Sequence, residues 1–66
     1  MLFKLRQLVG DTGFVADEYG GYVITVKDNE KFPWRDVFET LLASGFDVWI
    51  DKKGDSLQVF SKYKVE

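Results

Sequence analysis

The sequence contains no cysteine and no histidine among its 66 residues. Without cysteine there can be no disulfide and no thiolate metal site, and without histidine the commonest zinc ligand is missing. A chain of this length has room for one domain, which we expect to span residues 1–66. Side-chain packing must therefore stabilise that domain without covalent or metal crosslinks.

Long apolar runs are also absent. No stretch approaches the roughly 18 residues of a membrane-spanning helix, and the first residues lack the basic, apolar and small-residue regions of a signal peptide. We therefore expect a cytoplasmic protein that does not bind membranes. Nine basic and eleven acidic residues give a net charge of −2, which is too small to indicate a strongly charged partner.

Residues suited to catalysis are few. General acid–base chemistry near neutral pH most often uses histidine, and a nucleophilic serine needs a base within hydrogen-bonding reach. Ser44, Ser56 and Ser61 occupy an expected helix end and an expected strand, which are ordinary structural positions. Asp47 and Asp51 are four residues apart on a strand, so their backbones lie roughly 13 Å apart, too far for a glycosidase pair. The sequence predicts a non-enzyme without cofactor or metal.

Aromatic residues, in contrast, make up 17% of the chain. Five large apolar residues recur at helical spacing and define one stripe that we expect in the core: Trp34, Val37, Phe38, Leu41 and Leu42. Pro33 suits the first position of a helix, and Gly45 suits the left-handed residue just past its end. The pattern predicts an amphipathic helix over residues 33–44.

A β-hairpin is predicted after this helix. Residues 46–51 and 56–63 alternate in polarity and are joined by a turn at residues 52–55. One face of the hairpin is apolar and is expected to pack on the helix: Phe46, Val48, Ile50, Leu57 and Val59. The other face carries two large aromatic side chains among polar ones: Asp47, Trp49, Asp51, Gln58, Phe60 and Lys62.

Three further strands are predicted before the helix. Residues 22–27 alternate in polarity and follow Gly20-Gly21, a pair able to adopt positive φ, so residues 14–19 are the expected hairpin partner. We assign residues 2–9 to another strand, although some of their apolar positions, Leu2, Leu5 and Val9, also fit one face of a short helix.

Together these elements predict an α+β fold. The expected sheet is mostly antiparallel, with about five short strands in the order β-β-β-α-β-β, and a single amphipathic helix packs on one of its faces. The other face is then open to solvent. A small barrel of three plus two strands is the alternative architecture.

The open side of the final hairpin is the candidate functional site. With a four-residue turn, Trp49 lies opposite Gln58, and Trp49 and Phe60 become diagonal neighbours. Aromatic residues are enriched in interface cores and charged residues in their rims, so the predicted partner-binding set is Trp49, Phe60, Asp47, Asp51, Gln58 and Lys62. If the sheet curls, the first segment buries the two rings instead, through Leu2, Leu8 and Val15.

We therefore expect a small non-catalytic interaction module, a regulator or inhibitor that acts by stoichiometric binding to a partner protein. Its size is typical of accessory or phage-borne regulators. The strand that ends at residues 63–66 is expected at a sheet edge, where another chain, including a second copy, could pair with it. A homodimer would also stabilise so small a domain.

A single-stranded nucleic-acid-binding domain is the alternative function. Basic residues could share a face with the two rings and bind phosphates while the rings stack on bases: Lys4, Arg6, Lys27, Lys62 and Lys64. The negative net charge and the nearby acids Asp17, Asp47 and Asp51 argue against this function. A variant of the first function is an acidic decoy for the nucleic-acid site of a protein, because acids concentrate in the first half: Asp11, Asp17, Glu18, Asp28 and Glu30.

Overall fold

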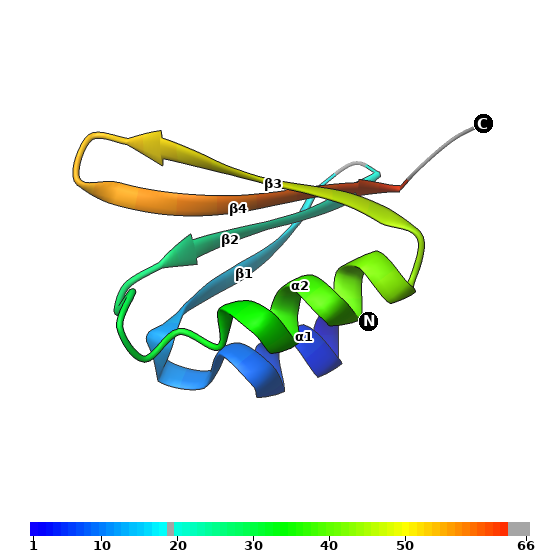
Figure 1. Cartoon of the computed structure of the whole chain (residues 1–66), viewed down its shortest axis with the longest axis horizontal. Helices are drawn as coiled ribbons and strands as arrows, with labels where there is room; N and C mark the ends of the chain where they lie inside the picture. The colour runs from blue at the N-terminus through cyan, green and yellow to red at the C-terminus, as the bar shows by residue number, and fades with distance from the viewer. Residues whose placement is uncertain (19, 64–66) are drawn as a thin grey trace.

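The computed structural model describes residues 1–18 and 20–63. It contains two helices and one four-stranded sheet, in the order α1 (Leu2–Val9), a 3₁₀ turn (Gly10–Thr12), β1 (Gly13–Glu18), β2 (Gly21–Val26), α2 (Trp34–Ala43), β3 (Phe46–Lys53) and β4 (Ser56–Tyr63) (Figure 1). The predicted α+β class and antiparallel sheet are confirmed, but the predicted numbers of elements, about five strands and one helix, are wrong. The predicted strand end at Tyr19 and residues 64–66 lie outside the described residues.

The first segment forms helix α1, so the predicted strand over residues 2–9 is wrong. Leu5 and Val9 are buried, with 0% and 2% of their surface exposed, and Leu8 is half-buried beside them. A helix gathers these three positions on one face, whereas a strand would direct Leu8 to the opposite side. Phe3 points away from the core and is 73% exposed.

Helix α2 begins and ends one residue inside the predicted limits. Val37 and Leu41 are fully buried, and Trp34 and Phe38 pack against the core at half burial. The expected burial of Leu42 in the core is wrong, because this side chain lies at the margin of the stripe and is 57% exposed. Gly45 follows the helix with φ of 88°, the left-handed conformation that its position predicted.

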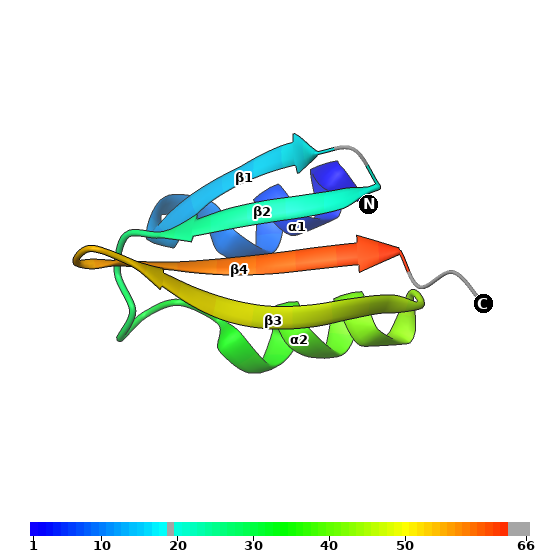
Figure 2. The ribbon, with the colours of Figure 1, turned by 90° about the horizontal axis from the view of Figure 1, so that it is seen from above.

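The strands are ordered β1-β2-β4-β3 in the sheet, and every neighbouring pair is antiparallel (Figure 2). Two hairpins, β1–β2 and β3–β4, are thus joined through the β2–β4 ladder. The expectation that the last strand lies at an edge is wrong: β4 is internal, and β1 and β3 form the two edges. Because these edges do not meet, the barrel alternative is also wrong.

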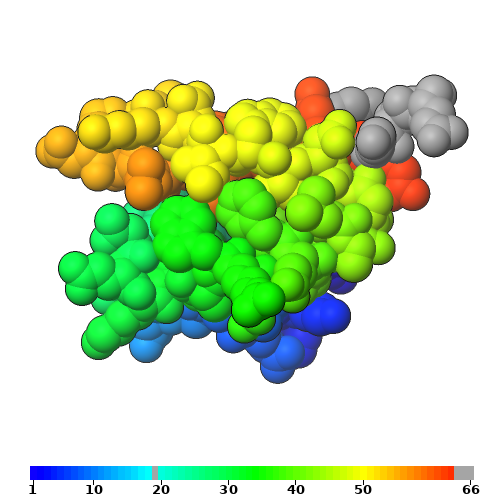
Figure 3. All heavy atoms as spheres, in the orientation of Figure 1, coloured from blue at the N-terminus to red at the C-terminus, as the bar shows by residue number. Residues whose placement is uncertain are grey.

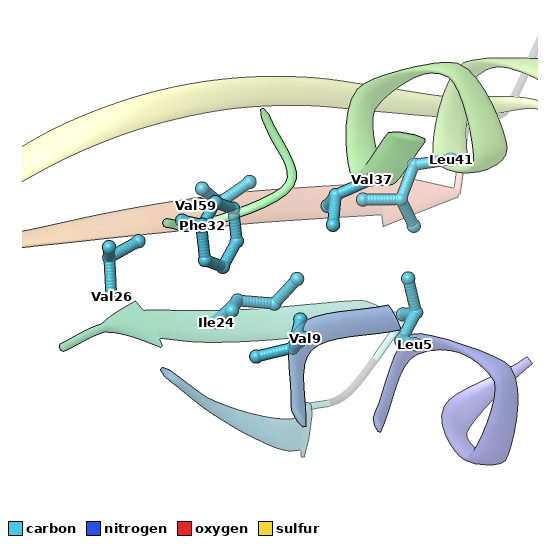
Figure 4. Close-up of a cluster of buried hydrophobic side chains, with 8 residues drawn as sticks. All are labelled: Leu5, Val9, Ile24, Val26, Phe32, Val37, Leu41 and Val59. Carbon is cyan, nitrogen blue, oxygen red and sulfur yellow. The ribbon is translucent and has the colours of Figure 1, made fainter. Parts of the chain in front are cut away.

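Both helices pack on the same face of the sheet (Figure 1), and the core lies between the two layers. Eight apolar side chains from both helices, the two central strands and the β2–α2 loop meet there (Figure 4): Leu5, Val9, Ile24, Val26, Phe32, Val37, Leu41 and Val59. Phe32 was not predicted; its loop is held by Asp28, whose carboxylate accepts hydrogen bonds from the Glu30 and Lys31 amides at 3.2 Å.

The β3–β4 hairpin extends past the start of α2, as its yellow and orange atoms in Figure 3 show. Ile50 lies on the edge strand β3 and is 49% exposed, so its predicted burial on the helix-packed side is wrong. Phe46, Val48 and Leu57 point to the same side and are half-buried, as expected.

Candidate functional site

The sheet has one face covered by the helices and one without a covering element among the described residues (Figure 1). We call the uncovered side the open face. Side chains alternate along a strand, so the residues that flank the buried Ile24, Val26 and Val59 point to the open face. The N-terminal segment lies on the helix side, and the alternative in which it covers Trp49 and Phe60 is therefore wrong.

Strand register aligns four apolar side chains across the open face. Ala16 pairs with Val23, Val23 with Phe60, and Phe60 with Trp49, so one residue comes from each strand. We call this set the apolar row. Trp49 is 45% exposed, Ala16 is exposed, and Val23 and Phe60 are half-buried. The row thus leaves a continuous apolar strip in contact with solvent.

Trp49 and Phe60 stand directly opposite each other, so their predicted diagonal placement is wrong. Their ring centroids are 5.9 Å apart and their planes differ by 11°, which is a stacked pair. The register differs because the hairpin turn contains two residues, Gly54 and Asp55, and the ladder continues to the Lys53–Ser56 pair. Gly54 has φ of 59°, which suits the first central position of a tight hairpin turn.

Polar rows flank the apolar row on both sides. On one side Asp47 pairs with Lys62, and on the other Asp51 pairs with Gln58. The Gln58 Nε2 donates a hydrogen bond to Thr25 Oγ1 at 3.3 Å, which ties the second row to β2. All six residues of the predicted partner-binding set therefore share one surface.

The open face has two features that the sequence did not single out. Phe14 on β1 is 62% exposed, and the Lys27 ammonium lies 4.7 Å from its ring centroid. A shallow pocket of about 350 Å³ lies beside the aromatic pair, lined by Glu18, Val23, Trp49, Phe60, Ser61 and Lys62. The alternation of Phe14 with Val15 could have indicated the first feature, but the pocket depends on the β2–β4 pairing.

The basic residues proposed for nucleic-acid binding are not brought together. Lys4 and Arg6 belong to α1, which packs on the other side of the sheet, and Lys64 lies outside the described residues. Of that set, Lys27 and Lys62 remain on the open face. Asp17 pairs with Tyr22 and therefore points to the helix side, contrary to the expected shared face. Asp47 and Asp51 do lie on the open face.

One of the three serines bonds to the backbone of β2 through its side chain. Ser61 is 5% exposed; its hydroxyl accepts a hydrogen bond from the Tyr22 amide and donates one to the Tyr22 carbonyl, both at 3.2 Å. Among residues 1–18 and 20–63, no group of three or more acidic, histidine or cysteine residues could hold a metal ion. No helix in the same residues is long and apolar enough to cross a membrane.

Comparisons with protein-family models, with curated proteins and with solved structures find no match to this chain. The function must therefore be inferred from the open face and its chemistry.

Proposed function

We propose that this protein is a small non-catalytic interaction module, a regulator or inhibitor that binds a partner protein stoichiometrically through the open face. The observation that carries the proposal is the apolar row, which crosses all four strands and ends in the stacked pair of Trp49 and Phe60. Large aromatic side chains near the centre of a contact surface supply most of the binding energy in protein interfaces.

The flanking charges suit a protein contact. Among the described residues, the open face carries three acids and three bases: Glu18, Asp47, Asp51, Lys27, Lys53 and Lys62. Mixed signs around an apolar centre match the polar rim of a protein interface and set the orientation of the partner. Such a surface has no net charge that would attract a polyanion.

The size of the face limits the contact. Four strands about 4.8 Å apart and six residues at about 3.4 Å each give a footprint of roughly 19 by 20 Å. Typical interfaces bury about 800 Å² per partner, so the partner must either follow the relief of the side chains closely or reach past the sheet edges. We therefore expect affinity to depend strongly on the two rings.

Single-stranded nucleic acid is the second candidate, because Trp49 and Phe60 lie beside Lys62 and could stack on bases. The stacked pair argues against it, since each ring already uses one of its faces on the other. The balanced charge of the open face argues against it as well. We retain this function as a defined outcome of the test below.

The test is capture of a partner from a lysate of the source organism with matched baits. The wild type and Phe3→Ser, an exposed position on α1, should retain the partner, whereas Trp49→Ala and Phe60→Ala should lose it. With the purified partner, we expect calorimetry to show at least a roughly 30-fold weaker Kd for Trp49→Ala, as for a large aromatic anchor. Equal affinity of Trp49→Ala and wild type contradicts the proposal.

Two further measurements assign the other outcomes. Light scattering on the pure protein identifies a homodimer, which Trp49→Ala should dissociate if the copies meet through the open face. A labelled single-stranded oligonucleotide, titrated at two salt concentrations, identifies nucleic-acid binding by an affinity that falls steeply as salt rises. Binding of that kind, lost in Trp49→Ala, supports the second candidate against the first.

A further inference from the structure

A second concave site lies where the β1–β2 turn meets the start of β3, and it shares one border residue, Glu18, with the pocket on the open face. It has a volume of about 250 Å³ and is lined by Asp17, Glu18, Gly20, Gly21, Tyr22, Phe46 and Tyr63. Its rings come from three strands: Tyr22 from β2, Phe46 from β3 and Tyr63 from β4. Phe46 pairs with Tyr63 in the sheet, and all three side chains point to the helix side.

The three rings form a corner. Tyr22 and Phe46 have centroids 5.7 Å apart with planes inclined at 58°, and Phe46 and Tyr63 have centroids 5.4 Å apart with planes at 85°. We call these residues the aromatic corner. Tyr22 and Phe46 are half-buried and held against the core, while Tyr63 is 60% exposed. The three rings are therefore inclined to one another where they line the pocket.

The described residues that line the pocket carry charge of one sign. Asp17 and Glu18 are exposed at its border, and none of the described residues that line it carries a positive side chain. Gly21 is another lining residue, and β4 passes it so closely that a Cβ there would overlap the Ser61 carbonyl oxygen. Aromatic faces and carboxylates together create a negative potential around a shallow cavity.

We propose that the aromatic corner binds an alkylammonium cation, either a methylated lysine side chain or a small quaternary amine. The negative faces of aromatic rings attract such cations, and a cage of rings at mutual angles contacts several N-methyl groups at once. The Asp17 carboxylate, on the same side of the sheet as the three rings, compensates the positive charge without direct coordination. An anion would be repelled, and two carboxylates are too few for a metal site that relies on protein oxygens alone.

The first experiment titrates choline chloride into the full chain and follows ring and backbone NMR signals. We expect saturable shifts confined to the pocket with a Kd on the order of 10 mM, because each exposed cation–π contact changes an equilibrium constant by only about two- to fivefold. The uncharged isostere 3,3-dimethylbutan-1-ol and sodium chloride at equal ionic strength should give no such shifts. Equal shifts with the alcohol, or no saturable shift with choline or trimethyllysine peptide, overturn the proposal.

Two variants test the residues directly. Tyr63→Leu removes an exposed ring and should weaken choline binding about fivefold, and Asp17→Asn should weaken it about threefold. Phe14→Leu, an exposed ring on the open face, is the matched control and should bind choline as the wild type does. Thermal melts by circular dichroism confirm that each variant is folded. Unchanged binding by folded Tyr63→Leu excludes the aromatic corner as the site.

The same titration distinguishes the two sources of the cation. A peptide with trimethyllysine is compared with the unmethylated peptide and with choline. Tighter binding of the methylated peptide identifies a modified protein as the ligand, and tighter binding of choline identifies a small amine. Trp49 does not line this pocket, so Trp49→Ala should leave both titrations unchanged.

Discussion

The two halves of the molecule repeat the order helix, strand, strand, but they place different side chains on the open face. The first half, α1 with β1 and β2, contributes Ala16 and Val23 to the apolar row, and the second half contributes Phe60 and Trp49. The buried sides are more alike, since each helix places two or more aliphatic residues in the core. The two halves are therefore similar in their buried residues. They differ in the exposed residues that would bind a partner.

The halves meet along one ladder, in which β2 pairs with β4 from Gly21–Lys62 to Val26–Leu57. The aromatic corner also depends on this seam, because Tyr22 comes from the first half and Phe46 and Tyr63 come from the second. Neither proposed site is complete within a single half. Changes at the seam should consequently have larger effects than changes within either half.

Gly21→Ala should have the largest effect. A Cβ at this position would lie 1.8 Å from the Ser61 carbonyl oxygen and 2.9 Å from the Lys62 Cα, both backbone atoms of β4. The β2–β4 ladder must open to accommodate the added methyl group. The loss of stability should approach the whole free energy of unfolding, about 3–10 kcal/mol for a chain of this length. Urea denaturation followed by circular dichroism measures it.

Gly20→Asn is the matched control for the seam. Gly20 has φ of 81°, and a Cβ there would meet nothing within 4 Å. Asparagine adopts positive φ more readily than most residues, so this variant should lose only about 1 kcal/mol. Equal destabilisation by both variants would show that turn conformation, and not the close approach of β2 to β4, limits stability.

The next prediction compares the two helices in the core. Leu5 on α1 and Leu41 on α2 both have 0% exposure, so Leu5→Ala and Leu41→Ala should each cost about 3 kcal/mol. Phe3→Ser and Leu42→Ser, at exposed positions of the same helices, should each change stability by less than about 0.5 kcal/mol. A much smaller loss for Leu5→Ala than for Leu41→Ala would show that α1 contributes little to folding.

The sequence predicts the second half well because its boundaries carry strong local signals. Pro33 and Gly45 bracket a helical repeat, and the alternation on β3 and β4 assigns each residue to the correct face. The first half lacks such a start signal: α1 follows Met1, which provides no side-chain cap. Its eight residues favour a helix only through their packing on the sheet, because isolated helices this short are marginal in water.

The candidate site was predictable in part. Face assignment follows from alternation alone, which is why Trp49, Phe60 and their polar neighbours were grouped correctly. The predicted register was wrong, because the same residues between the strands can form a turn of two or four residues. Ala16 and Val23 were missed because they join the apolar row only through the β2–β4 pairing, which connects residues distant in the sequence.

Replacing the glycines that end the two helices should destabilise the protein by different amounts. Gly45 has φ of 88°, and Gly10 combines φ of 55° with ψ of −131°, which lies outside the left-handed well open to other residues. We expect Gly10→Ala to lose about 2 kcal/mol and Gly45→Ala about 1 kcal/mol in urea denaturation. The reverse order would show that the left-handed end of α2 is under greater constraint than the transition from α1 into β1.

The smallest effect is expected for the stacked pair that distinguishes the second half. Trp49→Ala should cost well under the ~3 kcal/mol of Leu41→Ala, because the indole is 45% exposed and lies outside the core. A double-mutant cycle with Phe60→Ala should give a coupling of about 1 kcal/mol, since the rings stack at 5.9 Å.

This last comparison also separates packing from binding at the open face. If Trp49→Ala destabilises as much as Leu41→Ala, the rings act as core residues, and loss of partner binding in that variant would report unfolding. If stability is nearly retained while partner affinity falls, the rings are present on this face for recognition. Val23→Thr, in the first half of the same row, should then weaken binding of the partner with little change in stability, because the contact spans both halves.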